Sequence, residues 1–212
     1  MNVGALTNVV ALPLDDDTLR LLGFGTVTLI TTMGRDGSVN AAPHSRATTA
    51  SYSPPQILIS VNTAHDTYRN IVETREFVIN IPGSDLIQQI WIAQKHLPYG
   101  VDELEQAQLT AFPAERVQPP RIEECKAHIE CKAVWSKLAG SSCLVLGNVE
   151  AISAKREIGK LATEDRAIAL NRLIFLSYQK SEGGRTWVFA EIGKIHTLTE
   201  RDGRIKIHTE KI

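Results

Sequence analysis

The stretch NAAPHSRATTASYSPPQILIS, residues 40–60, decides the fold and holds a first candidate site. Its last part leads into QILISV (56–61), a short continuous apolar run after two prolines, which is typical of a strand covered on both faces. Its middle part, PHSRATTAS (43–51), is rich in small side chains and hydroxyls and carries Arg46. Small side chains let a ligand approach the backbone, while hydroxyl, amide and guanidinium groups donate hydrogen bonds to a planar, acceptor-rich ligand. The alternative is a Thr-rich edge strand with a polar outer face, because Thr favours strands.

A second candidate site lies where this strand leads into a helix, in QILISVNTAHDTYRNIVE (56–73). The first turn of a helix presents unpaired backbone N–H groups and the positive end of the helix dipole, which suit a phosphate. Short polar or basic side chains surround this position: Asn62, Thr63, His65, Thr67 and Arg69. The alternative is that Asp66 caps the helix and that no anion binds there. In both cases we expect Ile71 and Val72 to face the interior.

The rest of the chain predicts many strands and few helices. Strands are expected at 24–33, 38–45, 56–61, 76–82, 122–135, 142–153, 186–198 and 204–211, and helices at 65–76, 84–95 and 160–171. Asp36-Gly37 suits the turn of the first hairpin, and Arg201-Asp202-Gly203 that of the last. The second helix should bury the residues at helical spacing: Leu86, Ile90 and Ala93. This pattern predicts a mainly β barrel with peripheral helices.

Composition argues against several classes of protein. The chain has 212 residues, 43% of them hydrophobic and 22% charged, with a net charge of −1 and no basic patch, so a nucleic-acid binder is not expected. No run approaches the roughly 18 apolar residues of a membrane helix. The N-terminus lacks the basic start of a signal peptide, which favours a cytoplasmic protein. The chain contains no dinucleotide-binding GxGxxG, no P-loop and no GxSxG motif.

The residue types that most often carry metal or redox chemistry are expected to be structural here. The three cysteines, Cys125, Cys131 and Cys143, form no CxxC and should be reduced and buried. The six histidines show no ligand spacing, so no metal site is expected. On a regular strand His44 alternates with Ser45 and faces the opposite side. The tryptophans lie in apolar segments and are expected in the core: Trp91, Trp135 and Trp187.

The order of these motifs resembles the flavin reductase-like family of FMN-binding split barrels. The resemblance rests on VTLITTMGRDGSVNAAPHS, SPPQILIS and HDTYRNIVETREFVINIP, with further likeness in GVDELEQAQLT, PPRIEECKAHIECK and LVLGNVEAI. The matching positions are Asn40, Pro43, Ser45, Pro54, Pro55, Asp66, Thr67, Asn70, Ile71, Glu76, Phe77, Val78 and Asn80. The likeness runs from about residue 24 to residue 152.

This resemblance implies a mainly β fold with peripheral helices, an antiparallel Greek-key split β-barrel. It implies one FMN-binding domain over residues 1–212, with its core at about 20–155 and a C-terminal helix and strands at 156–212. It also implies a homodimer that binds FMN at or near the subunit interface. By position, the isoalloxazine ring would meet Ser45, Arg46, Ala47 and Thr48, and the ribityl phosphate would lie near Asn62, His65 and Thr67.

The activity expected from the resemblance is that of an NAD(P)H-dependent flavin oxidoreductase. Hydride would pass from nicotinamide to flavin, and the reduced flavin would serve an oxygenase or another electron acceptor. Because the cofactor carries such chemistry, the one candidate catalytic residue is Arg46, whose cation could stabilise charge on reduced flavin.

Two departures from the family pattern keep alternatives open. Many members have a histidine where this chain has Ser142, and an aromatic pair where it has Arg46 and Ala47. One alternative is a flavin-binding electron carrier without its own NAD(P)H site. The other is a split-barrel interaction module that binds no flavin.

Overall fold

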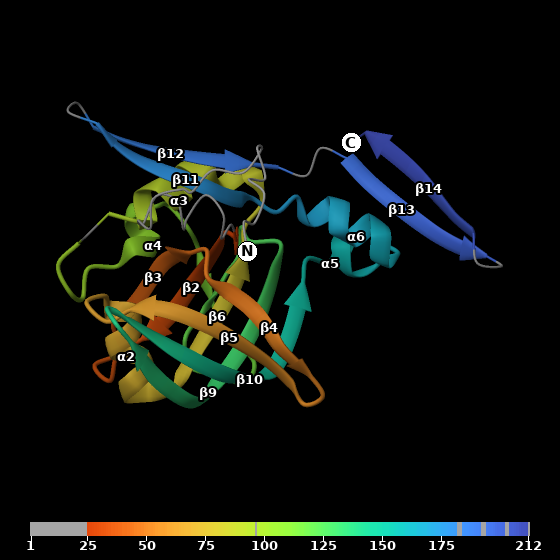
Figure 1. Cartoon of the computed structure of the whole chain (residues 1–212). Helices are drawn as coiled ribbons and strands as arrows, with labels where there is room; N and C mark the ends of the chain where they lie inside the picture. The colour runs from red at the N-terminus through yellow and green to blue at the C-terminus, as the bar shows by residue number, and fades with distance from the viewer. Residues whose placement is uncertain (1–24, 96, 182–183, 192–193, 202–203, 212) are drawn as a thin grey trace, which may run out of the picture.

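A seven-stranded antiparallel sheet forms the body of the molecule in a computed structural model (Figure 1). The structure describes residues 25–95, 97–181, 184–191, 194–201 and 204–211, so the expectations for residues 1–24 and 202–203 lie outside the described part. The strand order is β3-β2-β6-β9-β10-β5-β4. The strands are β2 (Thr28–Met33), β3 (Val39–His44), β4 (Ala47–Tyr52), β5 (Pro55–Asn62), β6 (Glu76–Ile81), β9 (Ala127–Ala139) and β10 (Ser142–Ala154).

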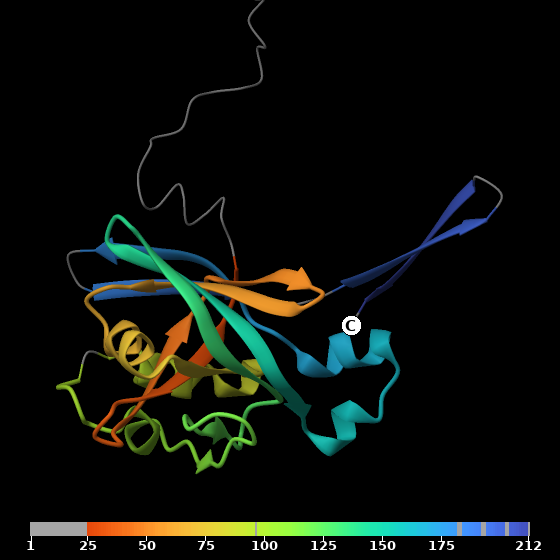
Figure 2. The ribbon, with the colours of Figure 1, turned by 90° about the horizontal axis from the view of Figure 1, so that it is seen from below.

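The sheet curls into a barrel that is split between its two edge strands. These edges, β3 and β4, follow each other in the chain, because β3 ends at His44 and β4 begins at Ala47. The link between them, Ser45 and Arg46, therefore lies at the split. Figure 2 shows the curled sheet from below. The mainly β split-barrel fold is thus confirmed.

Three smaller sheets accompany the barrel. One joins β1 (Gly25–Thr26), β11 (Ile174–Ser181) and β12 (Gly184–Ala190), in the order β1-β11-β12. The others are the pairs β7 (Ala111–Phe112) with β8 (Arg121–Ile122), and β13 (Lys194–Arg201) with β14 (Arg204–Lys211). Among the described strands β13 and β14 pair only with each other, and Figures 1 and 2 show this hairpin standing apart from the barrel.

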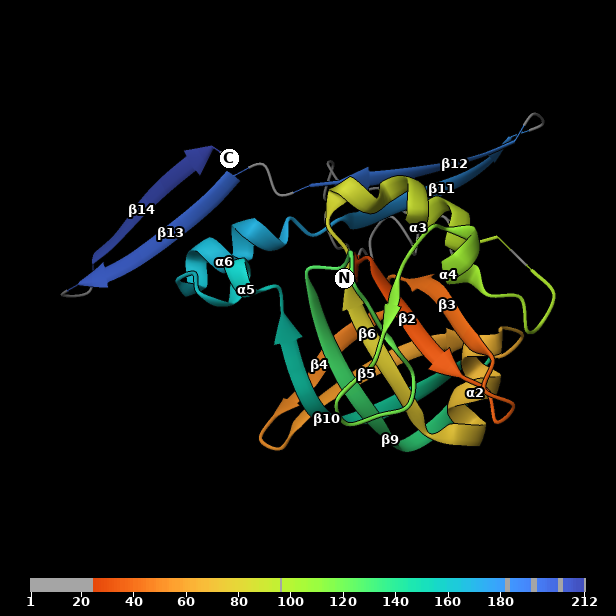
Figure 3. The same cartoon turned by 180° about the vertical axis from the view of Figure 1, so that it is seen from behind.

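Helices cover the end and one side of the barrel (Figure 3). They are α2 (Asp66–Thr74), the 3-10 turn η1 (Ser84–Leu86), α3 (Ile87–Ala93), α4 (Glu103–Gln106), α5 (Arg156–Gly159) and α6 (Thr163–Leu170). Helix α2 packs against β2, while α3 and α4 pack against β3. Within the described residues, every helix is too short or too polar to cross a membrane.

The interior consists of two cores on the two faces of β2. Leu29 points toward a core shared with the helices, where the predicted inward residues Leu86, Ile90 and Ala93 are buried as expected. Ile30 points into the barrel, whose core contains Ile57, Ile59, Val61, Ile71, Phe77, Ile79, Cys131, Cys143 and Val145. Because successive strand residues face opposite sides, the continuous apolar run of β2 buries both of its faces.

A buried polar cluster ties the first hairpin to helix α2. The amide of Asn40 donates to Thr32 Oγ1 and to Thr67 Oγ1, each over 3.2 Å. The amide of Asn70 also donates to Thr32 Oγ1, over 3.1 Å. Asn70 and Thr67 are fully buried. Three residues that carry the family resemblance, Asn40, Thr67 and Asn70, therefore hold the elements of the fold together.

Two expectations for helix α2 are wrong. The N-cap residue is His65, which has an extended backbone and makes no side-chain cap hydrogen bond, whereas Asp66 is the first residue of the helix. Val72 is 46% exposed. The buried side of the helix is the narrow stripe of Thr67, Asn70 and Ile71, and Val72 lies about 100° round the axis from Ile71, beyond this stripe.

The three cysteines are free and buried, as expected. Burial raises the pKa of the Cys131 thiol to about 12 and raises that of Cys125 as well. A thiol that stays protonated is a weak nucleophile, so these two side chains serve packing. The predicted Asp36-Gly37 turn also forms, since Gly37 has a φ of 83°.

Candidate functional site

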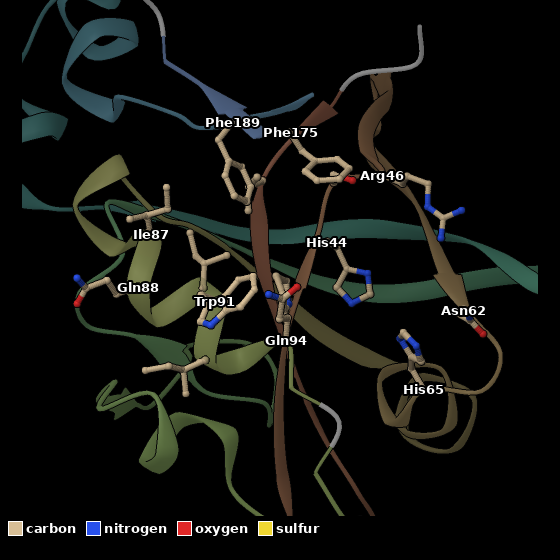
Figure 4. A pocket seen from close by; sticks show the side chains of 15 residues that line it. His44, Arg46, Asn62, His65, Ile87, Gln88, Trp91, Gln94, Phe175 and Phe189 are labelled. Atoms are coloured by element: carbon tan, nitrogen blue, oxygen red, sulfur yellow. The ribbon is translucent and has the colours of Figure 1, made fainter. Parts of the chain in front are cut away.

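A cavity of about 800 Å³ opens beside the split between β3 and β4 (Figure 4). This volume lies within the range of pockets that enclose small molecules. The lining comes from the β3–β4 link, the end of β5, the start of α2, helix α3 and strands β11 and β12. No aspartate or glutamate is among the lining residues. The cavity therefore suits an uncharged or anionic ligand rather than a cation.

Two walls of different chemistry face this cavity in Figure 4. The polar wall is formed by His44, Ser45, Arg46, Asn62 and His65. The apolar wall is formed by Ile87, Trp91, Phe175 and Phe189. A ligand that fills the space between them must offer polar groups on one side and a flat apolar surface on the other.

Hydrogen bonds hold the two segments of the polar wall near the start of β10. Arg46 Nη1 donates to Ser142 Oγ over 3.4 Å. The backbone N–H and the hydroxyl of Thr63 both donate to the carbonyl of Ser141, over 3.0 and 3.1 Å. The side chain of Asn62 accepts from the Ala64 N–H over 2.9 Å, which shapes the loop before α2. These contacts hold Arg46 and the loop before α2 in place without a ligand.

The backbone of Ser45 also packs closely against strand β1. Gly25 lies so close that a Cβ atom at this position would collide with the carbonyl oxygen of Ser45. Only glycine lets the two backbones approach to this extent. The packing of β1 against Ser45 therefore fixes the position of the β3–β4 link in the cavity wall.

His44 carries an unsatisfied polar atom at the cavity. Its Nε2 is shielded from water and has no hydrogen-bond partner among the described residues. Burial first, and then the nearby His65 and Arg46, lower the pKa of His44 to about 3. The imidazole is therefore neutral at pH 7, with one nitrogen that donates and one that accepts. An unpaired buried nitrogen is costly, which makes it a ready contact for a polar group of a ligand.

The apolar wall combines one helix with two distant strands. Trp91 extends from α3 and is 44% exposed. Phe175 of β11 and Phe189 of β12 face each other with ring centroids 5.8 Å apart and planes at 60°. The expectation that Trp91 lies in the core is wrong, because this residue lies beside the buried stripe of α3 and faces the cavity. Trp135 on β9 is likewise 41% exposed, and the side chain of Trp187 lies outside the described part.

The structure brings four of the seven predicted binding residues together: Ser45, Arg46, Asn62 and His65. Three do not line the cavity. Ala47 packs against the barrel core, and Thr48 is exposed on the outer face of β4. The side chain of Thr67 is fully buried and accepts the hydrogen bond from Asn40.

Sequence reasoning missed His44 and the apolar wall. The alternation rule separates His44 from Ser45, but the regular strand ends at His44, so both residues line the same cavity. The exposed Trp91 had a detectable signal, since it falls between the inward positions Ile90 and Ala93 of its helix. Phe175 and Phe189 had none, because the pairing of β11 with β12 is what brings them together.

The lining fits a flavin mononucleotide. Its ring system offers several hydrogen-bond acceptors and one imide N–H, which match the donors of the polar wall and the unpartnered Nε2 of His44. Its phosphate matches the guanidinium of Arg46 and the start of α2, where His65 makes no side-chain cap hydrogen bond. A ring held by the polar wall would keep one face free toward the aromatic side chains across the cavity.

Comparison with known proteins agrees with this architecture. Residues 24–170 match the model of the flavin reductase like domain. A solved structure of nitrilotriacetate monooxygenase component B from Bacillus cereus has a TM-score of 0.75 at 22% identity, covering 87% of this chain and 96% of its own. Flavoredoxin of Desulfovibrio vulgaris (Miyazaki F) has a TM-score of 0.74 at 21% identity, covering 92% of this chain and all of its own.

Among curated proteins, an uncharacterized protein of Aquifex aeolicus (strain VF5) is 36% identical over 128 residues, which is 56% of this chain and 65% of that protein. A second relative, from Methanothermobacter thermautotrophicus, is matched over 50% of its length. The chain thus spans about half to two thirds of these relatives. Since the family model covers most of the chain, the protein belongs to the flavin reductase-like domain family.

Proposed function

We propose that the cavity binds FMN and that the chain is a flavin oxidoreductase, reduced by NAD(P)H and reoxidised by an oxygenase component or another acceptor. One observation carries this proposal. Two separate segments, the β3–β4 link and the loop from Asn62 to His65, bring polar side chains and the cation of Arg46 to one cavity whose described lining contains no carboxylate. Membership of the flavin reductase-like family supports the same conclusion.

The residues of the polar wall would divide the work of binding. Asn62 at the end of β5 and His65 at the N-cap of α2 would hold the phosphate, while Ser45 and His44 would hydrogen-bond the ring system. Arg46, kept in place by Ser142, would stabilise negative charge on the reduced ring. The FMN, when bound, supplies the hydride and electron transfer chemistry, and the protein supplies position and electrostatics.

The deciding experiment is the visible spectrum of the purified protein with FMN, followed by anaerobic addition of NADH or NADPH. Bound-flavin bands that bleach with nicotinamide support the oxidoreductase. A protein that neither shifts the FMN spectrum nor gains thermal stability from FMN contradicts the proposal. At 100 times the dissociation constant, a ligand should add about 2.7 kcal/mol of stability.

A second candidate function is a flavin-binding electron carrier without its own nicotinamide site. Ser142 favours it, because this position carries a histidine in many reductases and here only accepts a hydrogen bond from Arg46. Flavin bands that persist in NADH and NADPH but bleach with dithionite would favour the carrier over the reductase.

We also infer a homodimer through the outer face of β5, β10 and β9. Three apolar residues occupy paired positions across this face, with Leu146 opposite both Leu58 and Trp135. Leu58 and Leu146 are only half-buried and Trp135 is 41% exposed, so β5 is covered on one face within a single chain, not on both as the sequence suggested. A second copy packed on this face would bury all three.

A charge in this row tests the dimer. Trp135→Glu should convert the dimer to a monomer in size-exclusion chromatography with light scattering, because a buried unpaired carboxylate is costly. Lys160→Glu, at the exposed C-cap of α5, introduces a glutamate away from these three residues and should stay dimeric. A wild-type monomer, or a dimer that survives Trp135→Glu, argues against this interface.

A further inference from the structure

The apolar wall of the cavity contains no residue that the flavin proposal uses. All four predicted flavin residues that reach the cavity belong to the polar wall. Figure 4 shows three of them, Arg46, Asn62 and His65, on the side opposite Ile87 and Trp91. The apolar wall presents Ile87 and Trp91 from α3, with Phe175 and Phe189 from β11 and β12. We propose that this wall is a subsite for a second substrate, a flat and uncharged aromatic electron acceptor of the quinone class.

The chemistry of the wall selects this class of molecule. Side chains from α3, β11 and β12 that line the cavity are aliphatic, aromatic or amide, and none is charged. A dinucleotide carries phosphates and an aromatic acid carries a carboxylate, and neither finds a cation on this wall. A quinone needs a flat apolar surface and donors for its carbonyl oxygens. The amide of Gln94, which lies between the two walls in Figure 4, can provide such a donor.

The arrangement of the walls would place a quinone against the ring of a bound flavin. The inference rests on the proposed function, since a flavin held by the polar wall would present its free ring face to Trp91, Phe175 and Phe189. A quinone between that face and the aromatic side chains would stack on both. Two electrons and two protons pass from the reduced flavin to the quinone. Both C=O groups of the quinone become C–OH, and the flavin returns to its oxidised form. The flavin itself is reduced by NAD(P)H or, in an experiment, by photoreduction with a sacrificial electron donor.

The test uses protein in excess over FMN, photoreduced without oxygen and then mixed with menadione. Reoxidation should saturate with menadione concentration, and Trp91→Leu should raise the half-saturating concentration tenfold or more. Trp91→Phe, which keeps an aromatic ring, should stay within threefold of wild type. The dissociation constant of FMN, from fluorescence quenching, should change less than twofold in both variants.

Three results would overturn the subsite while leaving the flavin proposal intact. The first is a reoxidation rate that Trp91→Leu does not change. The second is a sulfonated naphthoquinone that is preferred over menadione in a way that depends on Arg46, which would place the acceptor at the polar wall. The third is an equal loss of the NADH reaction in Trp91→Leu, which would assign the wall to nicotinamide.

A calorimetric titration of flavin-free protein with menadione separates the two proposals. Menadione binding that Trp91→Leu weakens, in a protein that takes up no FMN, would show that the wall binds an aromatic molecule without a flavin, which refutes the flavin function and with it the acceptor role. FMN uptake that Trp91→Leu weakens tenfold would show that the wall contacts the flavin directly, which overturns the subsite.

Discussion

The two walls of the cavity are built in different ways. The polar wall comes from two short segments that hydrogen bonds from Arg46 and Thr63 hold against Ser142 and Ser141 at the start of β10. The apolar wall comes from three elements far apart in the chain, and its described contact is the packing of Phe175 against Phe189. Hydrogen bonds are directional, whereas apolar contacts depend mainly on area. The first wall can therefore select a particular cofactor, while the second selects only shape and the absence of charge.

The largest effect is expected at Gly25, whose backbone packs against Ser45 of the polar wall. Gly25→Ala places a Cβ atom against the carbonyl of Ser45, so the two backbones must separate. Overpacking of this kind costs about 1–3 kcal/mol, which urea unfolding will measure. The FMN affinity should fall with it, because the β3–β4 link moves.

Gly159→Ala is the matched control, since a Cβ at Gly159 meets nothing within 4 Å and this glycine lies in helix α5. It should leave both stability and FMN affinity unchanged or slightly improved. If Gly25→Ala changes stability and FMN affinity as little as Gly159→Ala does, the contact between Gly25 and Ser45 does not position the β3–β4 link.

The next effect concerns the neutral His44. Its pKa of about 3 in the folded chain lies below the ordinary value of 6.5, so between these values the unfolded chain binds a proton that the folded chain does not. Stability is therefore intact above pH 6.5 and is lost as the pH falls. At pH 5 the loss reaches at most about 2 kcal/mol.

His44→Gln removes this titration and keeps a polar side chain. Its free energy of unfolding should fall less between pH 7 and pH 5 than that of the wild type, by up to about 2 kcal/mol. His128, whose pKa burial also lowers, is present in both proteins and cancels. Parallel pH profiles for the two proteins would mean that His44 is not held neutral.

The polar wall was largely predictable from sequence, because its residues are neighbours in the chain. A contiguous run of hydroxyls with one arginine, followed by a helix start, indicates donors that a fold can aim at one ligand. The same reasoning overreached where it assumed that every residue in such a run must face the ligand. Thr67 instead pairs with Asn40 inside the fold, and Ala47 packs on the barrel core.

The split barrel itself was predictable from the order of its motifs, but the cavity was not. Its apolar wall depends on the position of α3 against β3 and on the register that places Phe175 opposite Phe189. Neither contact leaves a periodic signal in the chain. Only the exposure of Trp91 could be read from the helical spacing, since Trp91 lies next to the inward positions Ile90 and Ala93.

A smaller effect is expected at Arg46, the polar-wall residue that is proposed to stabilise charge on the reduced ring. Arg46→Ala should slow the reduction of bound FMN by about tenfold and change its affinity by less. The effect stays below the 10²–10³ of a buried oxyanion donor because this side chain is exposed. Arg46→Lys keeps the charge and should restore part of the rate, which stopped-flow reduction will measure. Equal rates in wild type and Arg46→Ala would exclude this role.

The smallest effect is expected at Thr48, the predicted ring contact that lies outside the cavity. Its side chain is exposed on the outer face of β4, opposite Leu58 of the apolar row. Thr48→Ala should therefore change the FMN dissociation constant less than twofold in fluorescence titration, whereas Ser45→Ala on the polar wall should weaken binding several-fold. A loss at Thr48 as large as that at Ser45 would mean that flavin reaches the outer face, where the second copy is proposed to pack. The polar wall would then be shared between two chains.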